Sequence, residues 1–289
     1  MSTENSLVFV AEIGQNHNGN LSTAVEMINA AANAGATAVK FQKRVPALAV
    51  PEAQRDTPKD TPWGTMSYLK YRECLEFSKA DYDIIDSYCR EMVNIPWFVS
   101  VWDIPSAELM LQYDNPYVKI PSAKITDLAL LRYVAANHGS HQIVLSTGMS
   151  TLEEIDQAVK VLQGEDPIVL HCTSTYPCPH EEINLQVIPE LAVRYPLRIG
   201  YSGHESGLAP TIGAVALGAR FIERHFTLDR TMWGPDQAAS VETEGFRRLV
   251  RMCTTVANSL GTGNKEIMPG EVEPRKRLRG EVDATKERA

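Results

Sequence analysis

Short apolar runs that end in turn residues recur along the chain, and each is followed by a segment with helical spacing. Most of the runs are continuously apolar in their first half. This pattern is typical of parallel strands covered on both faces, whereas a half-exposed strand would alternate. The predicted strands are residues 8–14, 38–44, 97–103, 117–123, 142–148, 167–174, 198–204 and 221–227.

The intervening segments have the features of helices. Residues 21–35 carry an apolar stripe at helical spacing, and Gly35 suits a C-terminal cap. Residues Ser150 to Glu153 form a capping-box pattern that predicts the start of the helix after the fifth strand. Residues 208–217 and 241–260 supply the last two predicted helices.

Eight strand–helix units in a length of about 250 residues predict an α/β fold, a (β/α)8 TIM barrel that forms a single domain over residues 1–262. The alternative is a doubly wound open sheet. That fold usually has fewer strands and a GxGxxG loop after the first strand, where this chain has GQNHNGN (14–20). The sequence therefore favours the barrel.

Two segments depart from the regular alternation. About 35 residues rich in Pro, Asp, Trp and Tyr separate the second strand from a helix near residue 80. In a barrel this loop lies at the active-site face, so we expect a lid, with a surface insertion as the alternative. Residues 263–289 are highly charged, and we expect a short helical or frayed C-terminal extension.

Composition excludes several classes of protein. The 289 residues carry a net charge of −8, which disfavours binding to nucleic acid. The first residues show no basic segment followed by a long apolar run, so we expect no signal peptide, and without an apolar run of about 18 residues we expect no membrane span. Its five scattered cysteines include no CxxC pair, so neither a disulfide scaffold nor a cysteine zinc site is expected. We expect a soluble cytoplasmic protein.

Polar residues collect at the carboxyl ends of the predicted strands, where barrel enzymes build their active sites. Lys40 and Lys119 lie within apolar strands, and burying such a charge is costly unless an anion meets it. Together they suggest a doubly charged ligand at the barrel mouth; a salt bridge to a barrel glutamate is the alternative for each. The other polar residues there are Glu12, Gln42, Ser122, Lys124, Ser146, Thr147, Cys172, Thr173, Ser174, Tyr176, Ser202, His204, Glu223, His225 and Asp236.

Two histidines suggest a metal site. His204 and His225 end neighbouring strands, and two imidazoles completed by water and carboxylate oxygens suit Mn²⁺, Zn²⁺ or Fe²⁺. Only one of His171 and Cys172 can face the barrel interior, because successive side chains of a strand point to opposite faces of the sheet. The remaining histidines are expected at the surface or in loops: His17, His138, His141 and His180.

Seven motifs occur in an order that resembles the N-acetylneuraminate (sialic acid) synthase family over about residues 7–262. They are AEIGQNHNG (11–19), VKFQK (39–43), LSTGM (145–149), CTSTYP (172–177), GYSGH (200–204), ERHFTLDR (223–230) and GPDQAAS (234–240). Some of these motifs are closer to those of animal sialic acid phosphate synthases. The resemblance implies a transferase that condenses phosphoenolpyruvate with a sugar aldehyde such as N-acetylmannosamine, and a homodimer.

The resemblance also implies roles for the residues at matching positions. His204 and His225 would bind a divalent metal, Mn²⁺ or Mg²⁺. Glu12, Gln42, Tyr176 and Asp236 would face the sugar or the attacking water, with Glu12 or Asp236 relaying a proton. Phosphoenolpyruvate would be held by Lys40, Lys119, Ser122, Ser146, Ser174 and Ser202.

Two departures from the family pattern concern the acceptor sugar. Lys124 stands where the family usually has an acidic residue; it would either recognise an anionic group on the acceptor or point to solvent. Family members carry a C-terminal antifreeze-like domain that reaches across the dimer, and this chain stops at Ala289. We therefore expect that domain to be absent.

Two other activities are consistent with the same barrel. A Schiff-base aldolase would use Lys40 or Lys119 with pyruvate, but it would have no need of the histidine pair. A non-catalytic barrel that has lost its acceptor site would fit Lys124 and the missing domain, but not the complete anion and metal residues. Sequence favours the metal-assisted condensation.

Overall fold

The computed structural model describes residues 6–279, and within them eight parallel strands close into a barrel. Each strand pairs with the next in chain order, and the last pairs with the first, Val8 opposite Phe221. The strands are β1 (Val8–Gly14), β2 (Ala38–Lys43), β5 (Trp97–Val101), β6 (Tyr117–Ile120), β7 (Gln142–Ser146), β8 (Ile168–Cys172), β9 (Ile199–Gly203) and β10 (Phe221–Thr227). The predicted TIM barrel is confirmed.

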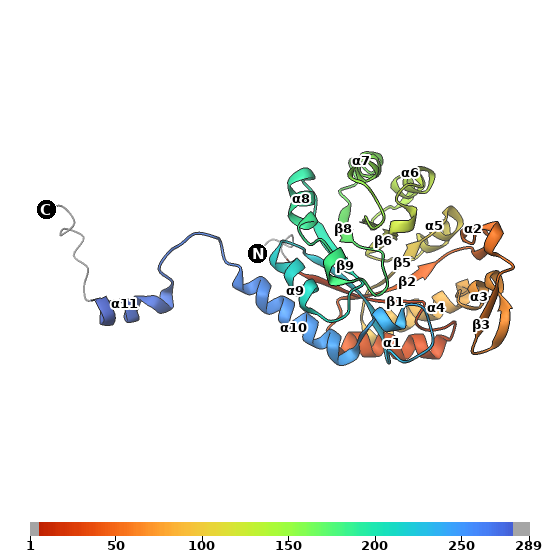
Figure 1. Cartoon of the computed structure of the whole chain (residues 1–289), viewed down its shortest axis with the longest axis horizontal. Coiled ribbons are helices and arrows are strands. Elements are labelled where there is room, and N and C mark those ends of the chain that lie inside the picture. Colours follow the sequence, from red (N-terminus) through yellow and green to blue (C-terminus); the bar gives the residue numbers. More distant parts are fainter. Residues whose placement is uncertain (1–5, 280–289) are drawn as a thin grey trace. The chain divides into compact units, whose positions relative to one another are not determined.

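A helix follows each barrel strand and packs outside it (Figure 1). The outward-facing strand residues form one large core with the inner faces of these helices, while a smaller cluster around Phe98 and Leu170 fills the barrel interior. The helices are α1 (Leu21–Asn33), α4 (Lys79–Ser87), α5 (Ile104–Met110), α6 (Leu128–Asn137), α7 (Leu152–Val161), α8 (Val187–Arg194), α9 (Ala209–Ala216) and α10 (Thr243–Ser259).

Local signals placed these elements to within a few residues. Gly35 has a φ of +92°, the left-handed conformation expected after the end of α1. The predicted capping box before α7 is wrong by one residue: Thr151 and Glu154 cap each other's backbone amides. The tandem Ser-Thr and Glu-Glu pairs offer the same pattern in two registers, and the structure uses the second. Before α10, Val241–Glu242 forms a short strand (β11) beside β10.

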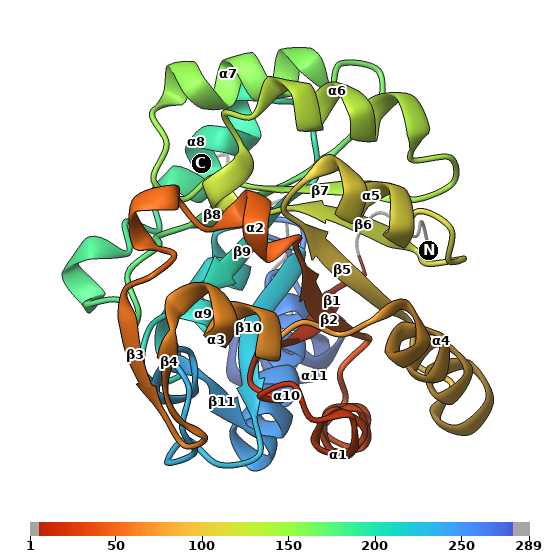
Figure 2. The same cartoon turned by 90° about the vertical axis from the view of Figure 1, so that its right-hand side faces the viewer.

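The long connection after β2 has secondary structure of its own. The hairpin of β3 (Pro58–Thr61) and β4 (Gly64–Ser67) carries Trp63 at its tip, whose ring lies 5.7 Å from that of Trp233. Figure 2 shows this hairpin beside α3, outside the ring of barrel strands. The remaining elements of the connection are α2 (Pro46–Ala49), a 3-10 turn at Glu52–Gln54 and α3 (Tyr68–Cys74).

The chain divides into two compact units between Ala257 and Asn258, whereas the sequence predicts a boundary at 262. The second unit contains a helix, α11 (Val272–Arg279). Of the predicted charged extension, residues 280–289 lie outside the described part. None of the described helices is both long and apolar enough to cross a membrane.

Two histidines predicted at the surface or in loops are buried. His17 lies in the turn after β1, where its ring stacks on Phe77 with centroids 4.0 Å apart. His141 precedes β7, and its Nε2 lies 2.9 Å from the carbonyl oxygen of Tyr113. Both rings are hydrogen-bonded, which makes burial of a neutral imidazole acceptable.

Candidate active site

A cavity of about 210 Å³ opens at the carboxyl ends of the barrel strands. Residues from all eight strand ends contribute to it because parallel strands in a barrel end on the same face. The predicted site residues that line it are Glu12, Lys40, Gln42, Lys119, Ser122, Ser146, Cys172, Ser174, Tyr176, Ser202, His204 and His225. The structure brings them together, and their individual roles remain predictions.

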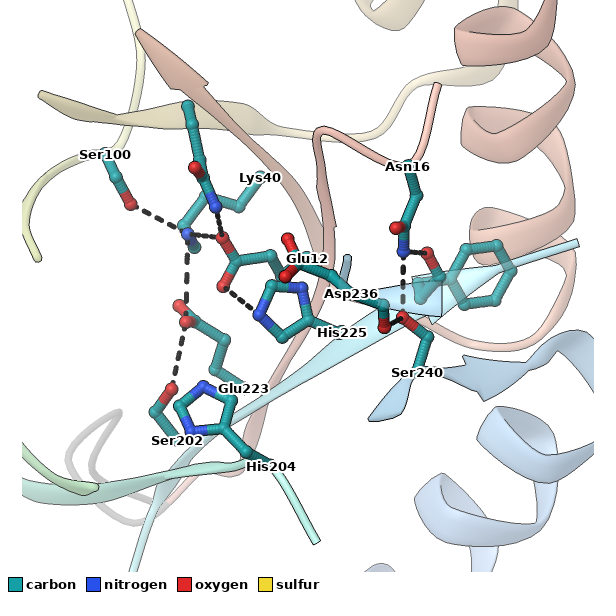
Figure 3. Close-up of polar contacts among 12 residues, drawn as sticks. Glu12, Asn16, Lys40, Ser100, Ser202, His204, Glu223, His225, Asp236 and Ser240 are labelled. Carbon is teal, nitrogen blue, oxygen red and sulfur yellow. Dashed lines mark hydrogen bonds and ion pairs between the residues drawn. The ribbon is translucent and has the colours of Figure 1, made fainter. Parts of the chain in front are cut away.

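Two lysines and two glutamates form a buried charge cluster in this cavity. Lys40 Nζ lies 2.6 Å from Glu12 Oε1 and 3.7 Å from Glu223 Oε1 (Figure 3). Lys119 Nζ also contacts Glu223 Oε1. Ser100 accepts a hydrogen bond of 2.8 Å from Lys40. All five side chains are almost inaccessible to solvent. Each lysine thus forms a salt bridge with a barrel glutamate, as the alternative interpretation of the sequence expected.

Neighbouring charges oppose the effect of burial on the pKa values of Glu12, Lys40 and Lys119. Burial alone would raise the pKa of Glu12, but Lys40, His225 and Lys119 outweigh it, so the pKa lies well below its usual range. For Lys119, burial is outweighed by Glu223 and Glu12, and its pKa is raised. Burial lowers the pKa of Lys40, with Glu12 opposing it. A carboxylate such as Glu12 is therefore available as a charged acceptor at neutral pH.

The two imidazoles predicted to bind metal lie next to each other in the lining of the cavity. His204 directly follows β9 and His225 lies in β10, with ring centroids 5.5 Å apart. His204 Nδ1 lies 2.8 Å from the carbonyl oxygen of Thr173, which leaves Nε2 to face a ligand. His225 Nδ1 is buried without a hydrogen-bond partner among the described residues, and its Nε2 lies 3.9 Å from Glu12 Oε2.

Protonation of the two rings differs. Burial lowers the pKa of His225, which favours the neutral form that ligates metals. For His204, burial is opposed by Cys172 and by the Thr173 carbonyl, and the pKa is raised. Residues 6–279 contain no group of three or more His, Cys, Asp or Glu side chains placed to hold a metal. A metal at these imidazoles would therefore take its other ligands from water or substrate oxygens.

On β8, alternation places Cys172 in the cavity and His171 behind the strand. Cys172 Sγ lies 3.7 Å from His204 Nδ1, whereas His171 Nε2 lies 2.7 Å from the carbonyl oxygen of Ile183. The hydroxyls of Thr147 and Thr173 likewise bond backbone carbonyls and do not line the cavity. Therefore only some of the polar residues at the strand ends line the cavity.

Close packing of hydroxyls explains a glycine at the cavity wall. The Gly148 amide donates to Ser122 Oγ at 3.0 Å. A Cβ at this position would lie 2.2 Å from Ser174 Oγ and 2.9 Å from Ser122 Oγ. Any larger residue would displace both serines, so the LSTGM motif needs glycine here for steric reasons.

Lys124 lies outside the cavity lining. It ends the 3-10 turn Ser122–Lys124, and its Nζ lies 3.7 Å from Asp127 Oδ2. The turn directs Ser122 into the cavity and Lys124 toward a neighbour in its own loop. The predicted role of Lys124 in acceptor specificity gains no support from this placement.

Asp236 lies in a neighbouring cavity of about 340 Å³ that shares Gln42, Trp102, Tyr176 and His225 with the first. Its carbonyl accepts a 2.7 Å hydrogen bond from Ser240 Oγ, which in turn accepts one of 2.8 Å from Asn16 Nδ2 (Figure 3). Asn16 also donates to the carbonyl of Phe226 at the end of β10. The turn after β1 thus holds the loop that carries Asp236.

Sequence reasoning gave no role to several residues of the site. Ser100 stands alone in an apolar strand and carries no signal of its own; barrel register places it beside Lys119 and Gln42. Glu223 was recognisable as an acidic residue at an inward position of β10. Arg44 lines the second cavity, where it lies over the Trp102 ring and pairs with Glu76.

Comparison with known proteins identifies the family. The model of the NeuB family matches residues 27–265. The chain is 36% identical to N-acetylneuraminate-9-phosphate synthase of Drosophila melanogaster over 284 residues, which cover 96% of this chain and 74% of that protein. The chain belongs to the NeuB family. The resemblance inferred from the seven motifs is confirmed, and this NeuB-family chain is an enzyme of the synthase type.

Other relatives share the family but differ in the product named. N,N'-diacetyllegionaminic acid synthase of Campylobacter jejuni is 35% identical over 272 residues, covering 91% of this chain and 80% of that protein. The crystal structure of N-acetylneuraminic acid synthetase from Leptospira borgpetersenii, in complex with citrate, matches with a TM-score of 0.85 and 31% identity. The match covers 96% of this chain and 93% of that one.

Proposed function

We propose that this protein condenses phosphoenolpyruvate with a sugar aldehyde, with the help of a divalent metal, to give a 2-keto-3-deoxy sugar acid and phosphate. The observation that carries the proposal is one cavity that joins two buried lysines and five serines to a pair of neighbouring imidazoles. Two relatives are named as synthases of N-acetylneuraminate 9-phosphate and of N,N'-diacetyllegionaminic acid, and these names support a nonulosonic acid as the product.

In this proposal, phosphoenolpyruvate lies over the lysines and serines. Lys40 and Lys119 offer charged donors to its phosphate and carboxylate, and Ser122, Ser174 and Ser202 offer hydroxyls. Ser146 Oγ is buried in the cavity without a hydrogen-bond partner among the described residues, as expected of a hydroxyl that donates to a ligand. Fixed donors in a site that excludes water are the most effective at holding a multiply charged substrate.

His204 and His225 would hold the metal, Mn²⁺ or Mg²⁺. His225 Nδ1 has no hydrogen-bond partner among the described residues, and the contact of His204 with the Thr173 carbonyl uses its Nδ1, not its Nε2. These nitrogens fit an ion that prefers nitrogen and oxygen ligands, and this donor set suits Mn²⁺ better than Mg²⁺. When bound, the ion would act as a Lewis acid toward the carbonyl oxygen of the acceptor.

The remaining residues would direct the reaction. C3 of phosphoenolpyruvate forms the new bond to the aldehyde carbon, one water adds at C2, and the C2–O bond to phosphate breaks. The water oxygen becomes the C2 keto oxygen, and its two protons end on the hydroxyl formed from the aldehyde oxygen and on the released phosphate. Glu12, ionised and lining the cavity, would orient that water and accept its proton. Gln42 donates to Glu12 Oε1 at 2.9 Å and would fix its orientation.

The neighbouring cavity would receive the acceptor. It contains Asp236 and shares Gln42 and Tyr176 with the first cavity, so a sugar lying there would present its aldehyde to the shared wall. We expect an N-acetylmannosamine-like aldose, with or without a phosphate, and a homodimer as the working form.

Mass spectrometry of products tests the proposal. The protein is incubated with phosphoenolpyruvate, Mn²⁺ and a panel of aldoses, and we expect one aldose to give a product that contains all three carbons of the enolpyruvyl group, with equimolar phosphate. Borohydride trapping with pyruvate is the control for a Schiff-base aldolase. A reduced lysine adduct, or no product with any aldose, would contradict the proposal.

A further inference from the structure

A buried ion pair lies directly beside the two imidazoles, between the barrel and α9. Glu205 follows His204 in the chain, and Arg224 precedes His225. The exposed fraction is 0% for Glu205 and 1% for Arg224, and neither lines the catalytic cavity. The pair therefore joins the two segments that carry the imidazoles without facing the substrate.

Both charged groups are held by several hydrogen bonds. Glu205 Oε1 accepts from Arg224 Nη1 at 2.9 Å and from Thr211 Oγ1 at 2.6 Å, and Oε2 accepts from Tyr201 OH at 2.9 Å. Arg224 Nη2 donates to the Glu205 carbonyl at 2.5 Å, and Nη1 donates to the Gly207 carbonyl at 3.0 Å. The guanidinium thus binds both the side chain and the backbone of the segment after His204.

Strand pairing does not provide this connection. The ladder between β9 and β10 ends at the pair of Gly203 and Arg224, so His204 lies beyond it. The Glu205 carboxylate folds back against the strand end: a Cβ on Gly203 would lie 2.5 Å from Glu205 Oε2. Beside the imidazoles the two strands share no ladder hydrogen bonds. There, the hydrogen bonds from Nη1 and Nη2 of Arg224 connect the two segments instead.

We infer that the Arg224–Glu205 ion pair is a positioning device for His204 and His225, which fixes their spacing and thereby sets the affinity of the site for a divalent ion. The inference rests on the proposed metal-assisted function. A buried ion pair is weak evidence for stabilisation, since apolar residues of similar volume often serve as well. A planar guanidinium that binds a carboxylate and two carbonyls supplies defined geometry, and lysine cannot reproduce it.

Binding of Mn²⁺ to the purified full chain without substrates, followed by the electron paramagnetic resonance signal of free Mn²⁺, tests the inference. Arg224→Lys keeps the buried positive charge but removes the planar guanidinium and its two Nη donors. We expect it to fold and to bind Mn²⁺ at least about tenfold more weakly, the range seen for residues that orient metal ligands. Leu249→Ala, in the buried core of α10, is the matched control: it should lower the melting temperature and leave Mn²⁺ affinity unchanged.

Glu205→Gln provides a second variant, because it keeps the side-chain volume and removes the charge. We expect weakened Mn²⁺ binding in this variant also. Folded Arg224→Lys and Glu205→Gln proteins with wild-type Mn²⁺ affinity would overturn the inference, and so would failure of both to fold, which would assign the pair to folding alone. A wild-type protein that binds no Mn²⁺ would also overturn it. Wild-type protein that binds Mn²⁺ but makes no sugar acid would contradict the proposed function and leave this inference standing.

Discussion

Lys40 Nζ lies 2.6 Å from Glu12 Oε1, and these two residues stand directly opposite each other in the register of β2 and β1. Both side chains are buried, so neither charge is tolerated without the other. The pair has two interpretations: a structural salt bridge, or a lysine that can also bind a substrate anion while Glu12 remains ionised beside it. Replacement of the residues one at a time and together separates these interpretations.

We expect Lys40→Met to weaken phosphoenolpyruvate binding by about 1.5–3 kcal/mol, roughly tenfold to a hundredfold, because a charged donor to the substrate is lost. The single variant should also lose about 3–5 kcal/mol of stability, since Glu12 is left buried and unpaired. The double variant Lys40→Met with Glu12→Gln should recover stability but not affinity. Calorimetric titration and thermal unfolding measure both; recovery of affinity in the double variant would make the pair purely structural.

Chelation tests the role of the imidazoles. We expect excess EDTA to abolish product formation and added Mn²⁺ to restore it, because Lewis-acid activation of the acceptor is lost and regained. Full activity in excess EDTA would defeat the metal assignment.

His225→Ala is the corresponding variant. It should retain the wild-type circular dichroism spectrum and lose at least about a hundredfold in turnover, equivalent to several kcal/mol of transition-state stabilisation. His180→Ala, at an exposed histidine, is the matched control and should retain activity. A turnover of His225→Ala close to that of the control would remove His225 as a ligand.

The barrel could be predicted because its strands are buried on both faces and therefore read as continuous apolar runs. Their starts were accurate to a residue, but β5, β6, β7 and β8 end two or three residues earlier than predicted, at Val101, Ile120, Ser146 and Cys172. The β3–β4 hairpin could not be predicted, since its strands are exposed and show no alternation. Its position depends on contacts such as that of Trp63 with Trp233, which only the fold creates.

The site was predictable where a residue is chemically out of place in its strand. Lys119 and His225, a lysine and a histidine within apolar runs, do line the cavity, whereas His171, in a similar run, lies behind its strand. Ser100 carries no such signal, and its place beside Lys40 depends on the register of neighbouring strands. Lys124 follows a strand end in the sequence, but a 3-10 turn places its Nζ 3.7 Å from Asp127 Oδ2 and outside the cavity lining, so its role in acceptor specificity stays a prediction.

Asn16 should act on the acceptor through Asp236. Asn16→Ala removes the donor to Ser240 and to the Phe226 carbonyl, so the loop that carries Asp236 loses one of its attachments to the turn after β1. The hydrogen bonds that Gln237 and Asn18 form between this loop and the turn remain. We expect a raised KM for the acceptor, an unchanged KM for phosphoenolpyruvate, and a loss of about 1–3 kcal/mol of stability.

Asn29→Ala is the matched control for Asn16, because Asn29 also forms a side-chain hydrogen bond, to Tyr88, away from both cavities. It should lower stability without changing either KM. Steady-state kinetics with each substrate varied in turn measures the difference; equal rises in both KM values for Asn16→Ala would contradict a specific role on the acceptor side.

His17 should make the stability of the fold depend on pH. Burial lowers its pKa from the ordinary 6.5 to about 3, with a hydrogen bond to Gly14 opposing the shift. Between these values the unfolded chain binds a proton that the folded chain does not, so stability is full above about pH 6.5 and falls as pH decreases toward 3. The contribution of His17 is about 1.4 kcal/mol for each pH unit in that window.

Urea unfolding at pH 7 and pH 5 measures this dependence. His17→Gln keeps a polar side chain in the turn and cannot be protonated, so it should lose less stability between the two pH values than wild type does, by about 2 kcal/mol. His180→Gln should behave as wild type, since His180 is exposed. Because the ring of His17 stacks on Phe77 beside the loop that follows β2, wild-type protein at pH 5 should also become more susceptible to proteolysis near that loop. An identical loss of stability in wild type and His17→Gln would show that the imidazole is protonated in the folded protein, and the stacked, neutral ring would then be the wrong description of this turn.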